Sequence, residues 1–179
     1  RTATPPSSND PSGDLGFDVK YAVTQNLAAD LTVNTDFAQV EADEQQVNLT
    51  RFSLFFPEKR EFFLENQGTF TFGGGGAGPF GGGPNTPVIF YSRQIGLEQG
   101  REVPLDVGGR LTGRVGAFSV GALNIQTDDE PVSGARSTNF SVVRVTRDLL
   151  RRSSIGAIFT RRSRSTRSSG SNETYGLDG

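Results

Sequence analysis

The chain has 179 residues, of which 34 % are hydrophobic, and its 18 basic and 20 acidic residues give a formal charge of −2. It contains no cysteine and no histidine, which excludes disulfides, thiol catalysis, cysteine-ligated zinc and a Ser-His-Asp triad built from this chain alone. No apolar run approaches the roughly 18 residues that a transmembrane helix needs. We therefore expect no cofactor, and we expect any crossing of a membrane to use strands.

The length favours a single domain. The first residues are rich in proline, serine and asparagine and have no hydrophobic periodicity, which is typical of a disordered linker to an upstream domain. The expected organisation is a linker over 1–14 and a β domain over 15–179, divided into an N-terminal hairpin (15–37), an aromatic and charged insert (38–72), a glycine-rich loop (73–87) and a meander (88–179).

Polar and apolar residues alternate over 15–37, with one interruption at Gln25 and Asn26. This period of two, broken by a two-residue turn, predicts an antiparallel hairpin. Its polar face is too highly charged for a packed core, so we expect it to face solvent or a water-filled lumen. The charged residues on that face are Asp18, Lys20, Asp30 and Asp36.

The centre of the insert, Asn48–Glu65, has the sequence NLTRFSLFFPEKREFFLE and is the stretch richest in both aromatic and charged residues. Pro57 favours an extended residue before it and suits the first turn of a helix after it. We therefore predict a short helix over 58–65. Such a helix would place Phe62 and Phe63 on one side and would project Glu58, Glu61 and Glu65 on the other.

Two hypotheses account for these carboxylates. Paired carboxylates can perform acid–base chemistry on a glycosidic bond when one of them is desolvated and has a raised pKa, which makes Glu58, Glu61 and Glu65 candidate catalytic residues. The favoured alternative is a plug inside a barrel, held by salt bridges. The candidate residues of this plug are Arg51, Glu58, Arg60, Glu65 and Arg93.

Two other segments resemble binding motifs only weakly. Glu41, Asp43 and Glu44 could bind calcium through carboxylate oxygens, but they lack the spacing of the helix–loop–helix calcium motif, so a solvated acidic turn is preferred. The glycine-rich run over 73–83 lacks the Gly-Lys-Ser/Thr ending of a phosphate loop and predicts a flexible loop.

The rest of the chain predicts further strands. The expected strands are 69–72, 88–95, 103–115, 118–127, 138–149, 154–160 and 174–179. Most are joined by short turns, which predicts an all-β antiparallel up-and-down meander. Because closure removes unpaired edges, we expect part of an up-and-down β-barrel, incomplete or open over this length, with the aromatic insert across its concave side. Strands of about ten residues with one apolar face also suit a barrel of the outer-membrane type.

Arginines gather over Arg136–Arg167. Such a basic segment could contact nucleic acid or lipopolysaccharide phosphate. A solvated strand end and loop is the simpler explanation, and we expect no nucleic-acid partner.

Three blocks of sequence resemble a known family. They are FAQVEADEQQVNLTRFSLFFPEKREFFLENQGTFTFG from Phe37 to Gly73, FYSRQIG from Phe90 to Gly96, and VGGRLTGRVGAFSVGALNIQT from Val107 to Thr127. In this order they resemble a family of bacterial outer-membrane β-barrel domains of unknown function, usually preceded by a family-nine-type carbohydrate-binding domain. The resemblance extends over nearly the whole chain from about Leu15.

The resemblance implies a location in the outer membrane of a Gram-negative bacterium, with membrane lipid and an upstream domain of the same parent chain as partners. It implies passage or surface handling of a solute, for which carbohydrate is a candidate, without covalent chemistry. The alternatives are a carbohydrate-active enzyme or carbohydrate-binding module that uses the carboxylates of 58–65, and a soluble β scaffold that presents loops to a protein partner.

Overall fold

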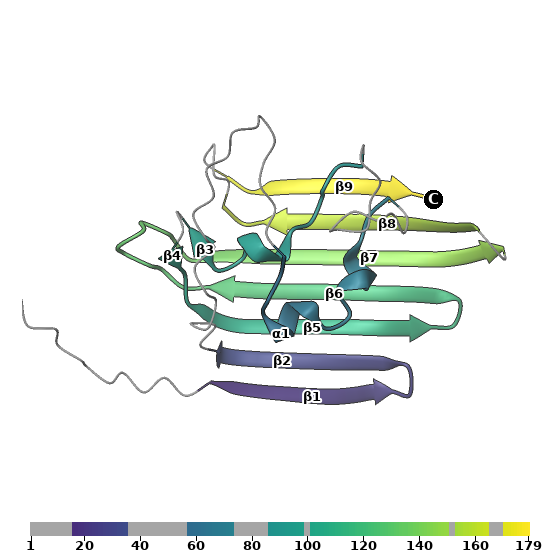
Figure 1. Cartoon of the computed structure of the whole chain (residues 1–179), viewed down its shortest axis with the longest axis horizontal. Coiled ribbons are helices and arrows are strands. Elements are labelled where there is room, and N and C mark those ends of the chain that lie inside the picture. The colour runs from purple at the N-terminus through teal and green to yellow at the C-terminus, as the bar shows by residue number, and fades with distance from the viewer. Residues whose placement is uncertain (1–15, 36–56, 74–85, 99–100, 151–152, 165–169) are drawn as a thin grey trace, which may run out of the picture.

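The structure is a computed structural model that describes residues 16–35, 57–73, 86–98, 101–150, 153–164 and 170–179 (Figure 1). Most of these residues form one seven-stranded antiparallel sheet with the order β1-β2-β5-β6-β7-β8-β9. Its strands are β1 (Phe17–Thr24), β2 (Leu27–Thr35), β5 (Leu105–Val115), β6 (Phe118–Thr127), β7 (Thr138–Leu150), β8 (Ser153–Arg162) and β9 (Asn172–Asp178). The predicted all-β meander is confirmed, and the described strands form an open sheet that does not close into a barrel.

The hairpin turns lie where the alternating pattern breaks. β1 turns into β2 after Thr24, and β5 turns into β6 at Gly116, whose φ of +61° lies in the left-handed region that glycine adopts without strain. Figure 1 shows that these short turns lie at one end of the sheet, while the longer connections gather at the other.

The described part of the connection from β2 to β5 crosses one face of the sheet (Figure 1), and this whole connection is called the insert from here on. Its described elements are the single-turn helix α1 (Glu61–Leu64), the 3₁₀ helices η1 (Gln67–Phe70) and η2 (Ser92–Gln94), and the small hairpin of β3 (Leu97–Glu98) and β4 (Arg101–Glu102). None of the helices in the described part of the chain is long and apolar enough to cross a membrane.

The insert differs from its predicted structure in three places. The helix expected over 58–65 is confirmed only as the single turn of α1. The strand expected over 69–72 is largely replaced by η1, which follows a left-handed Asn66 (φ 56°). The strand expected over 88–95 is irregular and ends in η2, because Ser92 and Arg93 turn inward and are buried.

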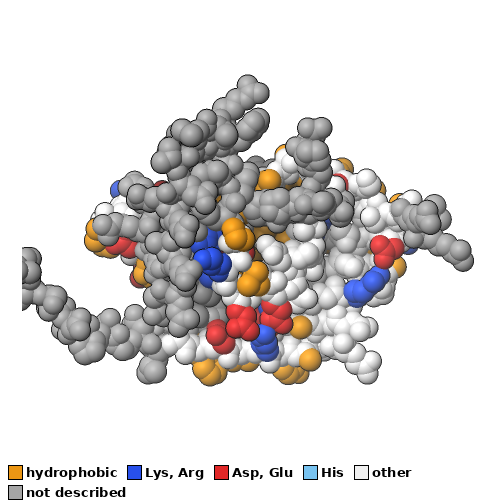
Figure 2. All heavy atoms as spheres, viewed as in Figure 1, with side chains coloured by type: hydrophobic (Ala, Val, Ile, Leu, Met, Phe, Trp, Pro, Cys, Tyr) orange, Lys and Arg blue, Asp and Glu red, His pale blue; other side chains and the backbone are white. Residues whose placement is uncertain are grey.

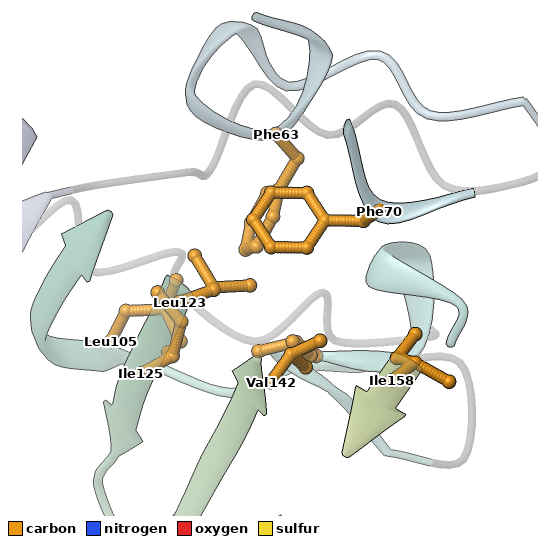
Figure 3. Close-up of a cluster of buried hydrophobic side chains, with 8 residues drawn as sticks. Phe63, Phe70, Leu105, Leu123, Ile125, Val142 and Ile158 are labelled. Carbon is orange, nitrogen blue, oxygen red and sulfur yellow. The ribbon is translucent and has the colours of Figure 1, made fainter. Parts of the chain in front are cut away.

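The hydrophobic core lies between the insert and the sheet. Phe63 and Phe70 of the insert point toward Leu123 and Ile125 of β6, as Figure 3 shows. The other buried members of this cluster are Ile95, Leu105, Val142 and Ile158. Gly121 allows this close approach, because a Cβ at that position would lie 2.8 Å from Thr69 and 3.0 Å from the Phe70 ring.

The opposite face of the sheet has no described element packed on it and is apolar and exposed. Tyr175 and Leu177 of β9 are 72 % and 79 % exposed, and Phe17 and Tyr21 of β1 are 65 % and 67 % exposed. We call this surface the apolar face. Its large exposed members are Phe17, Val19, Tyr21, Val23, Leu31, Val33, Val107, Val115, Phe118, Val143, Leu149, Ile155, Tyr175 and Leu177.

Ile125 and Ile155 offer a matched test of which face carries the core. Ile125 is fully buried under the insert, whereas Ile155 is 51 % exposed on the apolar face. We expect Ile125→Ala to lower the free energy of unfolding by about 2–5 kcal/mol and Ile155→Ala to lower it by less than about 1 kcal/mol. Denaturant titration of both variants measures the difference, and equal losses would contradict the assignment of the core.

Candidate functional site

The insert carries a buried ion pair directly after Pro57. Glu58 and Arg60 join as a bidentate pair, with Arg60 Nε 2.8 Å from Glu58 Oε1 and Arg60 Nη2 2.8 Å from Glu58 Oε2. The side chains are 0 % and 4 % exposed, respectively. The Ser92 hydroxyl donates a further hydrogen bond to Glu58 Oε2 at 2.7 Å, so the carboxylate is fully engaged.

Arg60 also fixes the distant end of the insert. Its guanidinium donates to the carbonyl oxygens of Ile95 at 2.5 Å and Ser92 at 2.8 Å, and it lies 4.2 Å above the centre of the Phe63 ring. One side chain therefore binds α1 to the segment around η2, which lies more than 30 residues further along the chain.

A second cluster joins the insert to the sheet. Arg110 of β5 donates to Asp30 of β2 at 2.5 and 2.9 Å. The same guanidinium donates to the Glu65 carboxylate at 2.9 Å and to the carbonyl oxygens of Glu65 and Phe62. Lys20 of β1 completes the group with a 2.5 Å contact to Glu65. Figure 2 shows acidic and basic side chains gathered on this face near β1 and β2.

A third cluster lies at the other edge of the sheet. Arg144 of β7 forms a bidentate pair with Asp178 of β9, at 2.5 and 2.7 Å. Asp178 also accepts a hydrogen bond from the backbone N–H of Gly73 at 2.7 Å, and Arg144 lies 5.7 Å from the centre of the Phe72 ring. Phe72 and Gly73, which follow η1, therefore contact β7 and β9, two strands that lie far from α1 in sequence.

The pKa values of two carboxylates identify these groups as ion-pair partners. Burial alone would raise the pKa of Glu58, but the hydrogen bonds and charge of Arg60, together with Ser92, outweigh it and lower the pKa. Hydrogen bonds from Lys20 and then Arg110 lower the pKa of Glu65. A carboxyl group that acts as a general acid near neutral pH needs a raised pKa, so both groups have the electrostatics of anchors.

The predicted site residues fall into separate environments. Glu58 and Glu65 each bind a different basic partner, while Glu61 is exposed in the first turn of α1. The prediction that all three project from one helix face is wrong, because Glu58 precedes α1 and Glu65 follows it. The pairing of Glu58 with Arg60 agrees with the plug arrangement, and Arg93 is 2 % exposed within the insert. Arg51, Glu41, Asp43 and Glu44 lie outside the described residues.

Sequence reasoning did not identify Arg110 or Arg144 as site residues. Alternation placed Arg110 on the polar face of its strand but gave no partner for it, since Glu65 lies 45 residues away along the chain. Within the described residues, no group of three or more acidic side chains could hold a metal ion.

Neutralising Glu58 tests the first ion pair. We expect Glu58→Gln to lower the free energy of unfolding by about 3–5 kcal/mol, because it leaves the buried Arg60 guanidinium without a counter-charge. Glu61→Gln removes the same charge from an exposed position of the same segment and should change the free energy by no more than about 0.5 kcal/mol. Denaturant titrations of the two variants make the comparison, and equal effects would show that the pair does not hold the insert.

The depressed pKa of Glu58 also predicts a direction of pH dependence. A carboxyl group with a lowered pKa in the folded state stabilises the fold above its unfolded value, here 4.5, and loses that contribution as the pH falls through the folded value. We therefore expect the free energy of unfolding to decrease below about pH 4.5. Glu58→Gln should flatten this dependence, and parallel curves for the two proteins between pH 6 and pH 3 would exclude Glu58 as a source.

Comparison with known proteins gives a family and no established activity. No curated protein and no solved structure matches the chain. Residues 3–106 match the family described as Domain of unknown function (DUF5916), a range that includes β1, β2, the whole insert and the start of β5. The chain belongs to this family of domains of unknown function.

Proposed function

We propose that the sheet is part of the wall of a β-barrel in the outer membrane of a Gram-negative bacterium, and that the insert is a plug on its lumen side. The barrel would serve passage or surface handling of a solute. Membrane lipid would then cover the apolar face, and the buried ion pairs would hold the plug against the wall.

One row of side chains across the apolar face carries this proposal. Strand register places one residue from each of the seven strands side by side in this row, and every member is apolar. The row consists of Tyr21, Ala29, Leu111, Ala122, Val143, Phe159 and Tyr175. A continuous exposed apolar surface of this width is unusual for a soluble monomer and marks a lipid or protein contact.

The opposite face of the sheet, beneath part of this row, has the polarity expected of a lumen. The inner neighbours of Tyr21, Ala29 and Leu111 are Lys20, Asp30 and Arg110, which form the second ion-pair cluster. Membrane β-barrels alternate in this way, with apolar residues toward lipid and polar residues toward the interior.

The apolar face has a defined polar boundary. Toward the end with the long connections, β6 and β7 present Asn124, Gln126, Asn139 and Ser141, which hydrogen-bond to one another at 2.8–3.2 Å. On β1, β2 and β5 the apolar residues continue further in this direction, to Phe17, Val33 and Val107. A boundary that shifts along successive strands is expected for strands tilted in a bilayer.

The carboxylate geometry gives less support to the glycosidase alternative. Glu58 and Glu65 have lowered pKa values and are engaged by Arg60 and Arg110, whereas glycoside hydrolysis requires a protonated acid and a second free carboxylate at one substrate. A carbohydrate solute and an upstream carbohydrate-binding domain remain part of the proposal through the family resemblance.

Refolding in two solvents tests the proposal. We expect a β-type circular dichroism spectrum to develop in micelles of a non-ionic detergent and not in plain buffer, because only the micelle covers the apolar face. A cooperative β fold in buffer, with no detergent bound, would overturn the membrane assignment.

Two valines provide a matched control for the same experiment. Val143 lies in the centre of the apolar row and is 42 % exposed, while Val132 lies in the loop between β6 and β7 and is 71 % exposed. In lipid vesicles, Val143→Arg should reduce stability by about 2–4 kcal/mol and Val132→Arg should have little effect. Equal tolerance of both arginines would contradict contact between lipid and the apolar face.

A further inference from the structure

The face of the sheet that bears the insert also carries a pocket, which lies apart from the three ion-pair clusters. A pocket of about 620 Å³ opens at the end of the sheet where the long connections gather. Its floor includes Phe140 of β7 and Arg162 of β8, its insert side includes Gly96 and Glu98, and the loop between β6 and β7 closes another side. This volume is in the range of sites that hold small molecules.

The charge of the pocket is strongly biased. The described residues that line it include the three arginines Arg136, Arg162 and Arg164, and one acidic residue, Glu98. Glu98 Oε2 lies 3.6 Å from Arg162 Nη2, so it compensates one guanidinium in part. Among the described residues, Arg136 has no ion-pair partner, and Arg164 uses only its Nε, which donates to the Ser137 carbonyl at 3.0 Å.

The nearby acidic residues are occupied in shaping the loop. Asp129 accepts from the Ser137 backbone N–H at 2.6 Å, and Glu130 accepts from the backbone N–H groups of Val132 and Ser133. These carboxylates hold the loop in place and do not line the pocket. Among the described residues that line the pocket, Glu98 is the only acidic one, so the lining itself carries a net positive charge.

Arg162 lies at the floor of the pocket and is held there by its neighbours. Its guanidinium lies 5.2 Å from the centre of the Phe140 ring. Its Nε is shielded from solvent and has no hydrogen-bond acceptor within the described part of the chain. A ligand in the pocket cannot reach this shielded N–H, so the partly exposed Nη groups of Arg162 are the ones that can donate to a bound anion.

We infer that this pocket binds a small soluble molecule that carries an oxyanion, a carboxylate or a phosphate, on a sugar-sized body. The arginines supply charge-assisted hydrogen bonds to the anion. The hydroxyls of Ser137 and Ser163 line the pocket and only accept hydrogen bonds within the described part of the chain, so they can donate to neighbouring hydroxyl groups of the ligand. A lipid headgroup is a poorer occupant, because the pocket opens on the face that bears the insert and the apolar face lies on the other side of the sheet.

The proposed function gives this pocket a position in the membrane. Outer-membrane barrels have short periplasmic turns and longer extracellular loops, so the end with the long connections would face the cell exterior. The pocket would then receive its anionic solute at the outer mouth of the lumen. This orientation rests on the proposed function, whereas binding of the anion rests only on the pocket.

Calorimetric titration tests the inference with three probes of similar size: glucuronate, glucose 6-phosphate and glucose. We expect at least one anionic probe to bind, with an affinity that falls as sodium chloride is raised from 50 to 500 mM, and we expect glucose to bind at least about tenfold more weakly. No binding of either anion to the folded protein, or equal binding of glucose, would overturn the inference.

Arginine variants locate the binding. The double change Arg136→Gln with Arg164→Gln should lower the affinity for the anion by about tenfold or more. Arg114→Gln is the control, because it removes one exposed charge at the opposite end of the strands, where Arg114 pairs with Asp148. An unchanged affinity in the double variant, or an equal loss in the control, would contradict the site.

The titration can be run in whichever solvent supports the fold. Anion binding by a protein that folds in plain buffer would support the pocket while overturning the membrane proposal. A protein that folds only in micelles and binds no anion would support the membrane proposal while overturning the inference about the pocket.

Discussion

The arrangement of this domain depends on the burial of Arg110. Its side chain is 2 % exposed, and an uncompensated guanidinium in such a position would cost several kcal/mol. Neither the sheet nor the insert satisfies it alone: the sheet supplies Asp30, and the insert supplies the Glu65 carboxylate and two carbonyl oxygens. The insert is therefore a structural part of this face of the sheet, since its departure would remove three of the four groups that accept hydrogen bonds from the buried guanidinium.

The same constraint explains why the two faces of one sheet differ so sharply. Arg110 and Leu111 are adjacent in β5, yet the charged residue is buried under the insert and the apolar residue lies in the exposed row. In a soluble sheet protein the charged face would be the exposed one. Here the pattern is inverted in β2 and β5, where Asp30 and Arg110 are buried, and the proposed contact with lipid would favour this inversion.

The sequence predicted the strands well where side-chain alternation was the dominant signal. The strand expected over 118–127 has the bounds of β6, and the hairpin turn after Thr24 lies where the pattern breaks. Prediction failed over 88–95, because a contact between residues distant in sequence, the hydrogen bond from Ser92 to Glu58, overrides the β propensity of this segment. Glu58 and Arg60 were both among the residues named for the plug, whereas the partners of Arg110 depend on register and on the path of the insert, which a single sequence does not encode locally.

One segment connects the ion pairs to the proposed anion pocket. Arg60 holds the carbonyl oxygens of Ser92 and Ile95, and the residues directly after Ile95 form the insert side of the pocket. Gly96 continues this wall, with its backbone carbonyl accepting from the Val103 N–H at 2.9 Å. The buried pair of Glu58 and Arg60 therefore helps to set the position of the pocket wall, so the proposed plug and the proposed solute site depend on the same contacts.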